Sequence, residues 1–195
     1  MQTYFSMKKT HTRGFTLIES LVAISIVLVG VTTVFTVAQL GISSSSSVRS
    51  RITAMFLAQE ALEAAKNLKD SNLHQISSNG AHINWLEGLK SSNGAEICPD
   101  YNGDTYCGFD VLKNTGDSDM FFQCNAGCQI YTEPSVGLFE QAASGVPNGI
   151  DTGFVRKISV DEVVPDKQAR VRVVISKPGT TFPDFEVVGF IYNWF

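Results

Sequence analysis

The chain has 195 residues, of which 44% are hydrophobic and 17% are charged, and its formal net charge is −4. This length suffices for one ordinary domain with an appendage. The mild negative charge, and the absence of a basic stretch interleaved with aromatic residues, disfavour direct contact with nucleic acid. Apolar residues dominate positions 15–42, and the first proline is Pro99. The composition therefore predicts an apolar N-terminal segment followed by a globular part.

The N-terminus begins with a short basic stretch that contains Lys8, Lys9 and Arg13 and no acidic residue. This stretch ends at Gly14, and the sequence FTLIE follows it, with Glu19 as its last residue. A carboxylate at the entrance of an apolar segment is costly unless it has a partner. The arrangement indicates that Glu19 has a specific role.

Residues 21–42 form a run without any charged side chain. A bilayer core of about 30 Å requires roughly 20 helical residues, so this run predicts a membrane-spanning helix. A buried core helix rarely runs this long without charge. A secretory signal has a shorter apolar region, about 7–15 residues, and a small-residue cleavage site that is missing here. The basic leader places the N-terminus in the cytoplasm, although Arg49 and Arg51 on the far side weaken this count.

After the five serines at 43–47, apolar residues recur at the spacing of one helical stripe: Ala54, Leu57, Ala58, Ala61, Leu62, Ala65 and Leu68. Polar residues fall on the opposite face: Glu60, Glu63, Asn67 and Asp70. The pattern predicts one helix from Phe15 to about Asp70. The serine run is alternatively a flexible linker.

Three stretches near the C-terminus alternate between apolar and polar residues, at 152–164, 169–177 and 184–194. Arg156 is the exception among the apolar residues of the first stretch. Turn-forming residues separate the stretches, so they predict an antiparallel meander with one face buried. The helical stripe at 54–68 is the natural cover for that face. The predicted fold is α+β, with a long N-terminal helix, membrane-spanning and then amphipathic, packed on a C-terminal antiparallel sheet.

The four cysteines all lie downstream of the apolar run: Cys98, Cys107, Cys124 and Cys128. Their even number, and an oxidising compartment beyond the membrane, favour two disulfides. The pairs Cys98–Cys107 and Cys124–Cys128 are preferred because their members are close in sequence. The nested pairing of Cys98 with Cys128 and Cys107 with Cys124 is the alternative. Only Cys124 and Cys128 have the spacing of zinc ligands, so zinc is disfavoured.

Other candidate sites are weak. Asp100, Asn102 and Asp104 alternate as in a calcium loop, but the glycine is at the fourth position instead of the sixth, so an Asn-Gly turn is the preferred interpretation. No catalytic motif accompanies the histidines: His11, His74 and His82. The sequence predicts no enzymatic activity, no cofactor and no metal.

The basic leader, Gly14, the sequence FTLIE and the apolar run together resemble the N-terminal signal of type IV pilins and pseudopilins. The resemblance implies that a prepilin peptidase cleaves between Gly14 and Phe15 and then methylates the new amino group of Phe15. It also implies that Glu19 pairs with the Phe15 amine of a neighbouring subunit and sets the register of the bundled helices. The three closing stretches look like the last strands of minor pilins and minor pseudopilins.

These observations give a leader at 1–14, a transmembrane and filament-core helix at 15–42, its amphipathic continuation at 43–70, and an extracytoplasmic headgroup at 71–195. The implied partners are the prepilin peptidase, other pilin or pseudopilin subunits, the inner-membrane assembly platform and the lipid bilayer. The precursor is expected in the inner (cytoplasmic) membrane, and the mature protein in a cell-surface or periplasmic filament.

The expected function is that of a structural minor pilin of a type IV pilus. A minor pseudopilin of a type II secretion or DNA-uptake system is the alternative within the family. A membrane-anchored enzyme or receptor is the alternative from another class, and the cleavage motif argues against it because a simple anchor needs neither Gly14 nor Glu19.

Overall fold

The computed structural model describes eight parts of the chain: residues 14–79, 83–92, 95–100, 105–110, 120–124, 128–135, 137–141 and 149–194. Two compact units divide the chain, Met1–Ser46 and Ser47–Phe195. The helix α1 (Leu17–Asn79) begins in the first unit and continues into the second. Because the five serines at 43–47 are all helical, the structure favours a continuous helix over a linker.

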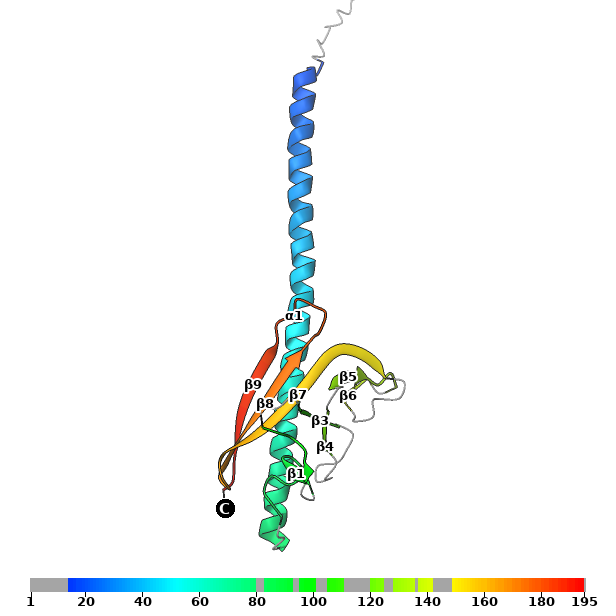
Figure 1. The fold of residues 1–195 in the computed structure, drawn as a ribbon. Coiled ribbons are helices and arrows are strands. Elements are labelled where there is room, and N and C mark those ends of the chain that lie inside the picture. Colours follow the sequence, from blue (N-terminus) through cyan, green and yellow to red (C-terminus); the bar gives the residue numbers. More distant parts are fainter. Residues whose placement is uncertain are drawn as a thin grey trace, which may run out of the picture. The chain divides into compact units, whose positions relative to one another are not determined.

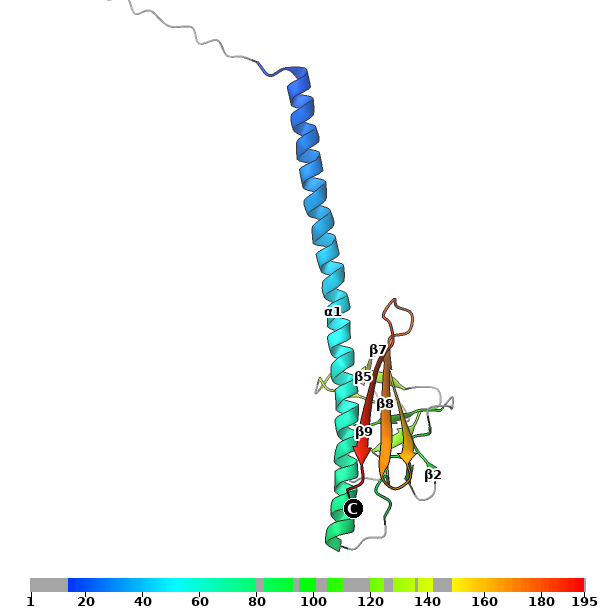
Figure 2. The same ribbon diagram turned by 90° about the vertical axis from the view of Figure 1, so that its left-hand side faces the viewer.

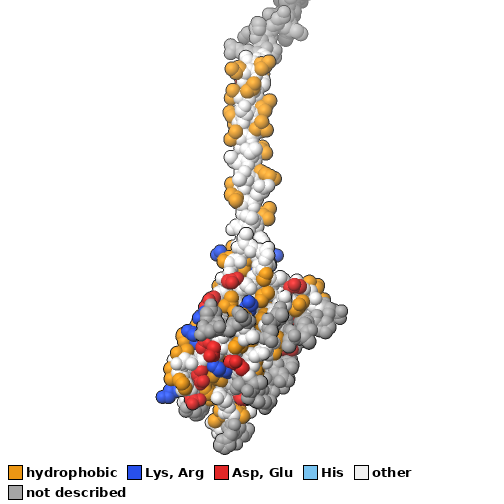
Figure 3. Space-filling model, in the orientation of Figure 1, with side chains coloured by type: hydrophobic (Ala, Val, Ile, Leu, Met, Phe, Trp, Pro, Cys, Tyr) orange, Lys and Arg blue, Asp and Glu red, His pale blue; other side chains and the backbone are white. Residues whose placement is uncertain are grey.

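In the first unit, α1 exposes apolar side chains, and Figure 3 shows them along both of its visible flanks. The hydroxyl groups within the apolar run donate to carbonyl oxygens three or four residues earlier, at 2.8–2.9 Å: Ser25, Thr32, Thr33 and Thr36. Such bonds satisfy polar groups in an environment without water. Among the described residues, α1 is the one helix long and apolar enough to cross a membrane, by length and composition.

In the second unit, one face of α1 is buried, as the periodicity predicted: Ala54, Leu57, Ala58, Ala61, Ala65 and Leu68. The helix ends at Asn79, beyond the predicted end near Asp70. The buried side chain of Asn72 explains the extension, because its amide donates to the carbonyl oxygens of Trp85 (3.2 Å) and Glu87 (2.8 Å). These bonds tie the additional helical turns to the segment that follows.

The predicted meander is confirmed by three antiparallel strands (Figure 1): β7 (Ile150–Val164), β8 (Gln168–Ser176) and β9 (Phe185–Tyr192). On the other edge of β7, β3 and β5 pair with different parts of that strand. The region before β7 contributes short strands: β1 (Ser91–Ser92), β2 (Ala95–Glu96), β3 (Cys107–Phe109), β4 (Phe121–Gln123), β5 (Gln129–Thr132) and β6 (Phe139–Glu140). β4 pairs with β3, β6 with β5, and β1 with β2.

The core lies between α1 and the meander, which stand side by side in Figure 2. The inward side chains of the sheet are fully buried: Ile158, Val160, Val171, Val173 and Ile175. Gly189 in β9 approaches α1 closely, because a Cβ at this position would lie 3.0 Å from Cδ2 of Leu62. The arrangement of one long helix against an antiparallel sheet is the α+β fold that the sequence predicted.

The structure contains the disulfides Cys98–Cys107 and Cys124–Cys128, with Cα–Cα distances of 4.9 and 5.3 Å. This is the sequence-local pairing, and both bonds lie in the second unit. Cys98 and Cys107 are fully buried, so the first bond is part of the core. Cys124 and Cys128 are joined to each other and therefore do not form a pair of zinc ligands here.

Tryptic digestion under non-reducing conditions separates the disulfide pairings. No lysine or arginine lies between Lys90 and Lys113, or between Lys113 and Arg156. The local pairing therefore gives two independent peptides, 91–113 and 114–156, each with an internal disulfide, whereas the nested pairing links them. We expect two separate peptides, which reduction makes heavier by two hydrogens each. A cross-linked species in natively exported protein would contradict the local pairing.

Candidate processing and assembly site

The start of α1 is organised by a local hydrogen-bond motif. The N–H of Glu19 donates to Oγ1 of Thr16 at 3.3 Å, and the N–H of Ser20 donates to the carbonyl oxygen of Thr16 at 3.2 Å. Thr16 is therefore the N-cap, and Glu19 occupies the third helical position, the spacing of a capping box. A carboxylate in the first turn is also favoured by the helix dipole. Thr16 was not predicted as a cap, although the spacing Thr-x-x-Glu is a sequence signal for one.

Gly14 and Phe15 lie directly before this capped helix and are not part of it. The side chain of Phe15 is 79% exposed. A proteolytic enzyme needs access to the bond that it cuts, and Gly14 and Phe15 are both exposed and outside the helix. The leader residues Lys8, Lys9 and Arg13 lie outside the described residues. The structure thus brings Gly14, Phe15 and Glu19 together within one turn's length of the start of α1.

Residues 9–35 match the family model of the prokaryotic N-terminal methylation motif. The chain carries a prepilin-type N-terminus. The matched range includes Gly14, Phe15 and Glu19, and it supports the type IV pilin and pseudopilin family that the sequence resembles. No curated protein and no solved structure matched the chain in the two other comparisons.

A prepilin-type N-terminus implies processing by a peptidase and assembly with other pilins. Together with the apolar part of α1, it fits a membrane-anchored precursor. The amino group that Glu19 is expected to contact exists only after cleavage. Its pairing with Glu19 therefore stays a prediction.

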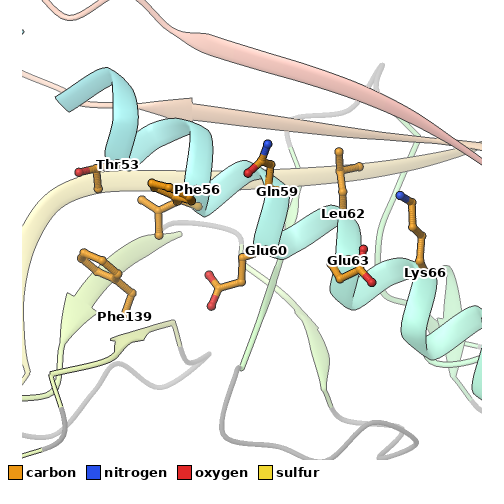
Figure 4. A pocket seen from close by; sticks show the side chains of 9 residues that line it. Thr53, Phe56, Gln59, Glu60, Leu62, Glu63, Lys66 and Phe139 are labelled. Carbon is orange, nitrogen blue, oxygen red and sulfur yellow. The ribbon is translucent and has the colours of Figure 1, made fainter. Parts of the chain in front are cut away.

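A second apolar surface lies on α1 within the second unit. Val48, Ile52, Met55 and Phe56 are exposed at the spacing of one helical face. Phe56 borders a hollow of about 690 Å³ that α1 forms together with Phe139 (Figure 4). Figure 4 shows Phe56 and Phe139 at one end of this hollow. Such a face suits packing against another amphipathic helix.

Three charged side chains also line the hollow, namely Glu60, Glu63 and Lys66 (Figure 4). Glu60 was predicted on the face of α1 opposite the apolar stripe, and in the structure its side chain is half-buried. One oxygen of Glu60 lies 2.8 Å from Nη1 of Arg156 in β7. The physical reason is that Arg156, the apolar-face exception of that strand, points inward and requires a carboxylate.

Arg156 is completely buried, and its guanidinium contacts Glu60 and three further residues. Nε donates to Oε1 of Gln141 at 3.0 Å, and the guanidinium stacks over the ring of Phe109 at 3.9 Å. Longer bonds of 3.4 Å reach the carbonyl oxygens of Leu57 and Phe109. Burial lowers the pKa of Arg156 to about 10, while Glu60 opposes this shift. At neutral pH Arg156 is therefore charged, and it joins α1, β3 and β7.

The remaining candidate residues are not brought together. Asp100 accepts a bond from Nζ of Lys90 at 2.8 Å, while Asn102 and Asp104 lie outside the described residues. His74 is exposed on α1, and the other two histidines also fall outside the described parts. Within those parts there is no group of three or more metal-ligating side chains that could hold an ion.

Proposed function

We propose that this protein is a structural minor pilin of a type IV pilus, cleaved by a prepilin peptidase and assembled through α1. One observation carries the proposal: the methylation motif matches at the place where Gly14–Phe15 precedes a capped, membrane-length helix with Glu19 in its first turn. The exposed apolar face of α1 supports assembly by helix packing. We further propose that the protein has no enzymatic activity of its own.

A minor pseudopilin is the second candidate, because the same motif serves pseudopilins. The large headgroup is the feature that favours a pilin, whereas its two disulfides fit either an oxidising periplasm or the cell surface. Immunoblotting of sheared surface filaments tests this choice. We expect the protein in the sheared fraction, and in larger amount when filament retraction is disabled. Recovery from the periplasm alone would favour the pseudopilin.

Processing gives a mass that can be measured directly. We expect the mature protein to begin at N-methylated Phe15, because the peptidase motif places the cut after Gly14. Intact-mass spectrometry of membrane-extracted protein should show the loss of residues 1–14 and the gain of one methyl group, ~14 Da. The product is the same whether translation starts at Met1 or at Met7.

The control is Gly14→Leu, which places a bulky side chain at the bond to be cut. This variant should accumulate as the unprocessed and unmethylated precursor. An unprocessed wild-type mass in cells with an active peptidase would refute the processing step.

A further inference from the structure

The strand β9 has an open edge. It pairs with β8 on one side, and no described strand pairs with its other side. Two backbone hydrogen bonds show which N–H and C=O groups of β9 face β8 and which face the open edge. The first lies at the end of the β8–β9 ladder. The N–H of Asn193 donates to the carbonyl oxygen of Lys167 at 2.9 Å, in register with the β8–β9 ladder. In an antiparallel ladder, alternate residues exchange bonds with the neighbour, so the odd-numbered residues of β9 face β8.

The second bond concerns β7, which pairs with the other side of β8, and it gives the same alternation independently. The N–H of Arg156 donates to the carbonyl oxygen of Cys128, directly before β5, at 2.9 Å. Arg156 therefore does not exchange backbone hydrogen bonds with Ile175, its register partner in β8. Ile175 therefore directs its backbone groups towards β9, where its partner is Phe185. It follows that residues 186, 188, 190 and 192 direct their N–H and C=O groups to the open edge.

The side chains of these same residues point to the exposed face of the sheet. Val188 is 42%, Phe190 46% and Tyr192 40% exposed, whereas the buried Ile191 faces the core. The ring of Tyr192 lies 5.5 Å from that of Trp194, which extends the row. Each outward residue of β9 therefore offers a peptide group that no described strand pairs with and, except at Glu186, an apolar side chain.

We propose that the open edge of β9 binds an extended segment of another polypeptide, which adds to the sheet as an antiparallel strand. Only a strand presents donors and acceptors at the spacing of this edge, and added strands obtain their specificity from alternate side chains. Glu186 is the charged residue of the row, and its half-exposed carboxylate lies 3.4 Å from Nη1 of Arg172 in β8. The partner thus carries apolar residues opposite Tyr192, Phe190 and Val188 and a side chain with a hydrogen-bond donor opposite Glu186.

A second copy of this chain is a poorer occupant. Two β9 strands paired antiparallel about a two-fold axis would point their α1 helices in opposite directions. Chains that enter one membrane by the same N-terminal motif have the same orientation. This choice of partner rests on the proposed function, whereas the open edge itself does not.

The test uses full-length mature protein in detergent and a labelled nine-residue probe, acetyl-TVTVTVTKT-amide. Paired antiparallel, its three valines meet Tyr192, Phe190 and Val188, and its lysine meets Glu186. We expect saturable binding below about 1 mM by fluorescence anisotropy. Methylating the amide nitrogens of the second and third valines should weaken binding at least tenfold, because these amides face β9. Methylating the threonines on either side of the second valine leaves the pairing amides free and is the matched control.

Two substitutions of Phe190 in the protein provide a second comparison. Phe190→Pro removes an N–H that faces the open edge, so the β8 ladder stays intact, and prolines are tolerated there. Phe190→Ala removes the same side chain and keeps the N–H. We expect Phe190→Pro to bind the probe at least tenfold more weakly than Phe190→Ala. In the wild type, hydrogen exchange should be fast at residues 186, 188, 190 and 192 and slow at 187, 189 and 191, and the probe should protect the first set.

Each contrary result overturns the proposal. The first is that the probe shows no binding up to about 1 mM. The second is that both methylated probes bind with the same affinity. The third is that the probe binds without slowing hydrogen exchange at residues 186, 188, 190 and 192. Self-association that Phe190→Pro abolishes would assign the edge to a second copy and would equally overturn it. The proposed pilin function fails on a different measurement, the incorporation of the protein into filaments.

Discussion

Replacing Glu19 with alanine should leave insertion and cleavage intact and reduce incorporation into filaments at least tenfold. A carboxylate within the apolar layer costs roughly 2.5–3.5 kcal/mol, so Glu19 requires a partner. No basic side chain lies between Glu19 and Arg49 in its own chain. Under the proposed function, the amino group that cleavage creates at Phe15 of a neighbouring subunit is the expected opposite charge. A loss of ~1.4 kcal/mol of this pairing already corresponds to a tenfold change.

The capping-box spacing provides the control. Glu19→Gln removes the charge but keeps a residue that is also preferred at the third position of capping boxes. If charge sets the register, the glutamine and alanine variants are both excluded from filaments. If Glu19 acts only on the helix start, the glutamine variant assembles normally. The measurement is the ratio of the protein in sheared filaments to that in membranes. Wild-type abundance of a normally processed Glu19→Ala protein would refute the register hypothesis.

Glu60→Gln should lower the free energy of unfolding by roughly 3 kcal/mol, because it leaves the charge of the fully buried Arg156 without a carboxylate. The value is taken at the lower end of the range for buried pairs, since the side chain of Glu60 is 35% exposed. Urea unfolding of the mature protein in detergent, followed by the fluorescence of Trp85 and Trp194, gives the difference.

Glu63→Gln is the matched control, because Glu63 lies on the same helix and is exposed. It should change the free energy of unfolding by less than about 0.5 kcal/mol. Replacing both members of the pair, as Glu60→Leu with Arg156→Met, should cost less than Glu60→Gln alone, because no unpaired charge is left. Equal effects of Glu60→Gln and Glu63→Gln would show that the pair does not stabilise the headgroup.

The elements that could be predicted from the sequence are those whose apolar residues recur at a regular spacing. The stripe at 54–68 and the alternation in β7–β9 are regular over several turns or residue pairs, so the helix, the meander and their contact could be predicted. The end of α1 could not, because the side chain of Asn72 decides it by binding carbonyl groups beyond the helix. The short strands β3–β6 are set by their pairing partners and carry no periodic signal of their own.

Within the site, Gly14, Phe15 and Glu19 were found because they form a contiguous motif. The pairing of Arg156 with Glu60 was missed, because 96 positions separate the two residues. Arg156 could nevertheless be recognised in the sequence, because it is the charged residue among the apolar positions of its stretch. An arginine in such a place predicts a carboxylate partner inside the fold or at its edge, but the sequence does not say which one.

The long separation between α1 and its covering strands has a consequence for the timing of export. The apolar stripe at 54–68 leaves the ribosome well before β8 and β9, which complete the core that covers it. Until these last strands are available, the stripe has no sheet to bury it, and the core of the second unit is incomplete. The proposed cleavage site at Gly14–Phe15 lies before α1, far from this core in the sequence. We therefore expect the proposed cleavage to be independent of headgroup folding, so that a chain truncated before β9 is still processed while its stripe remains open to proteases.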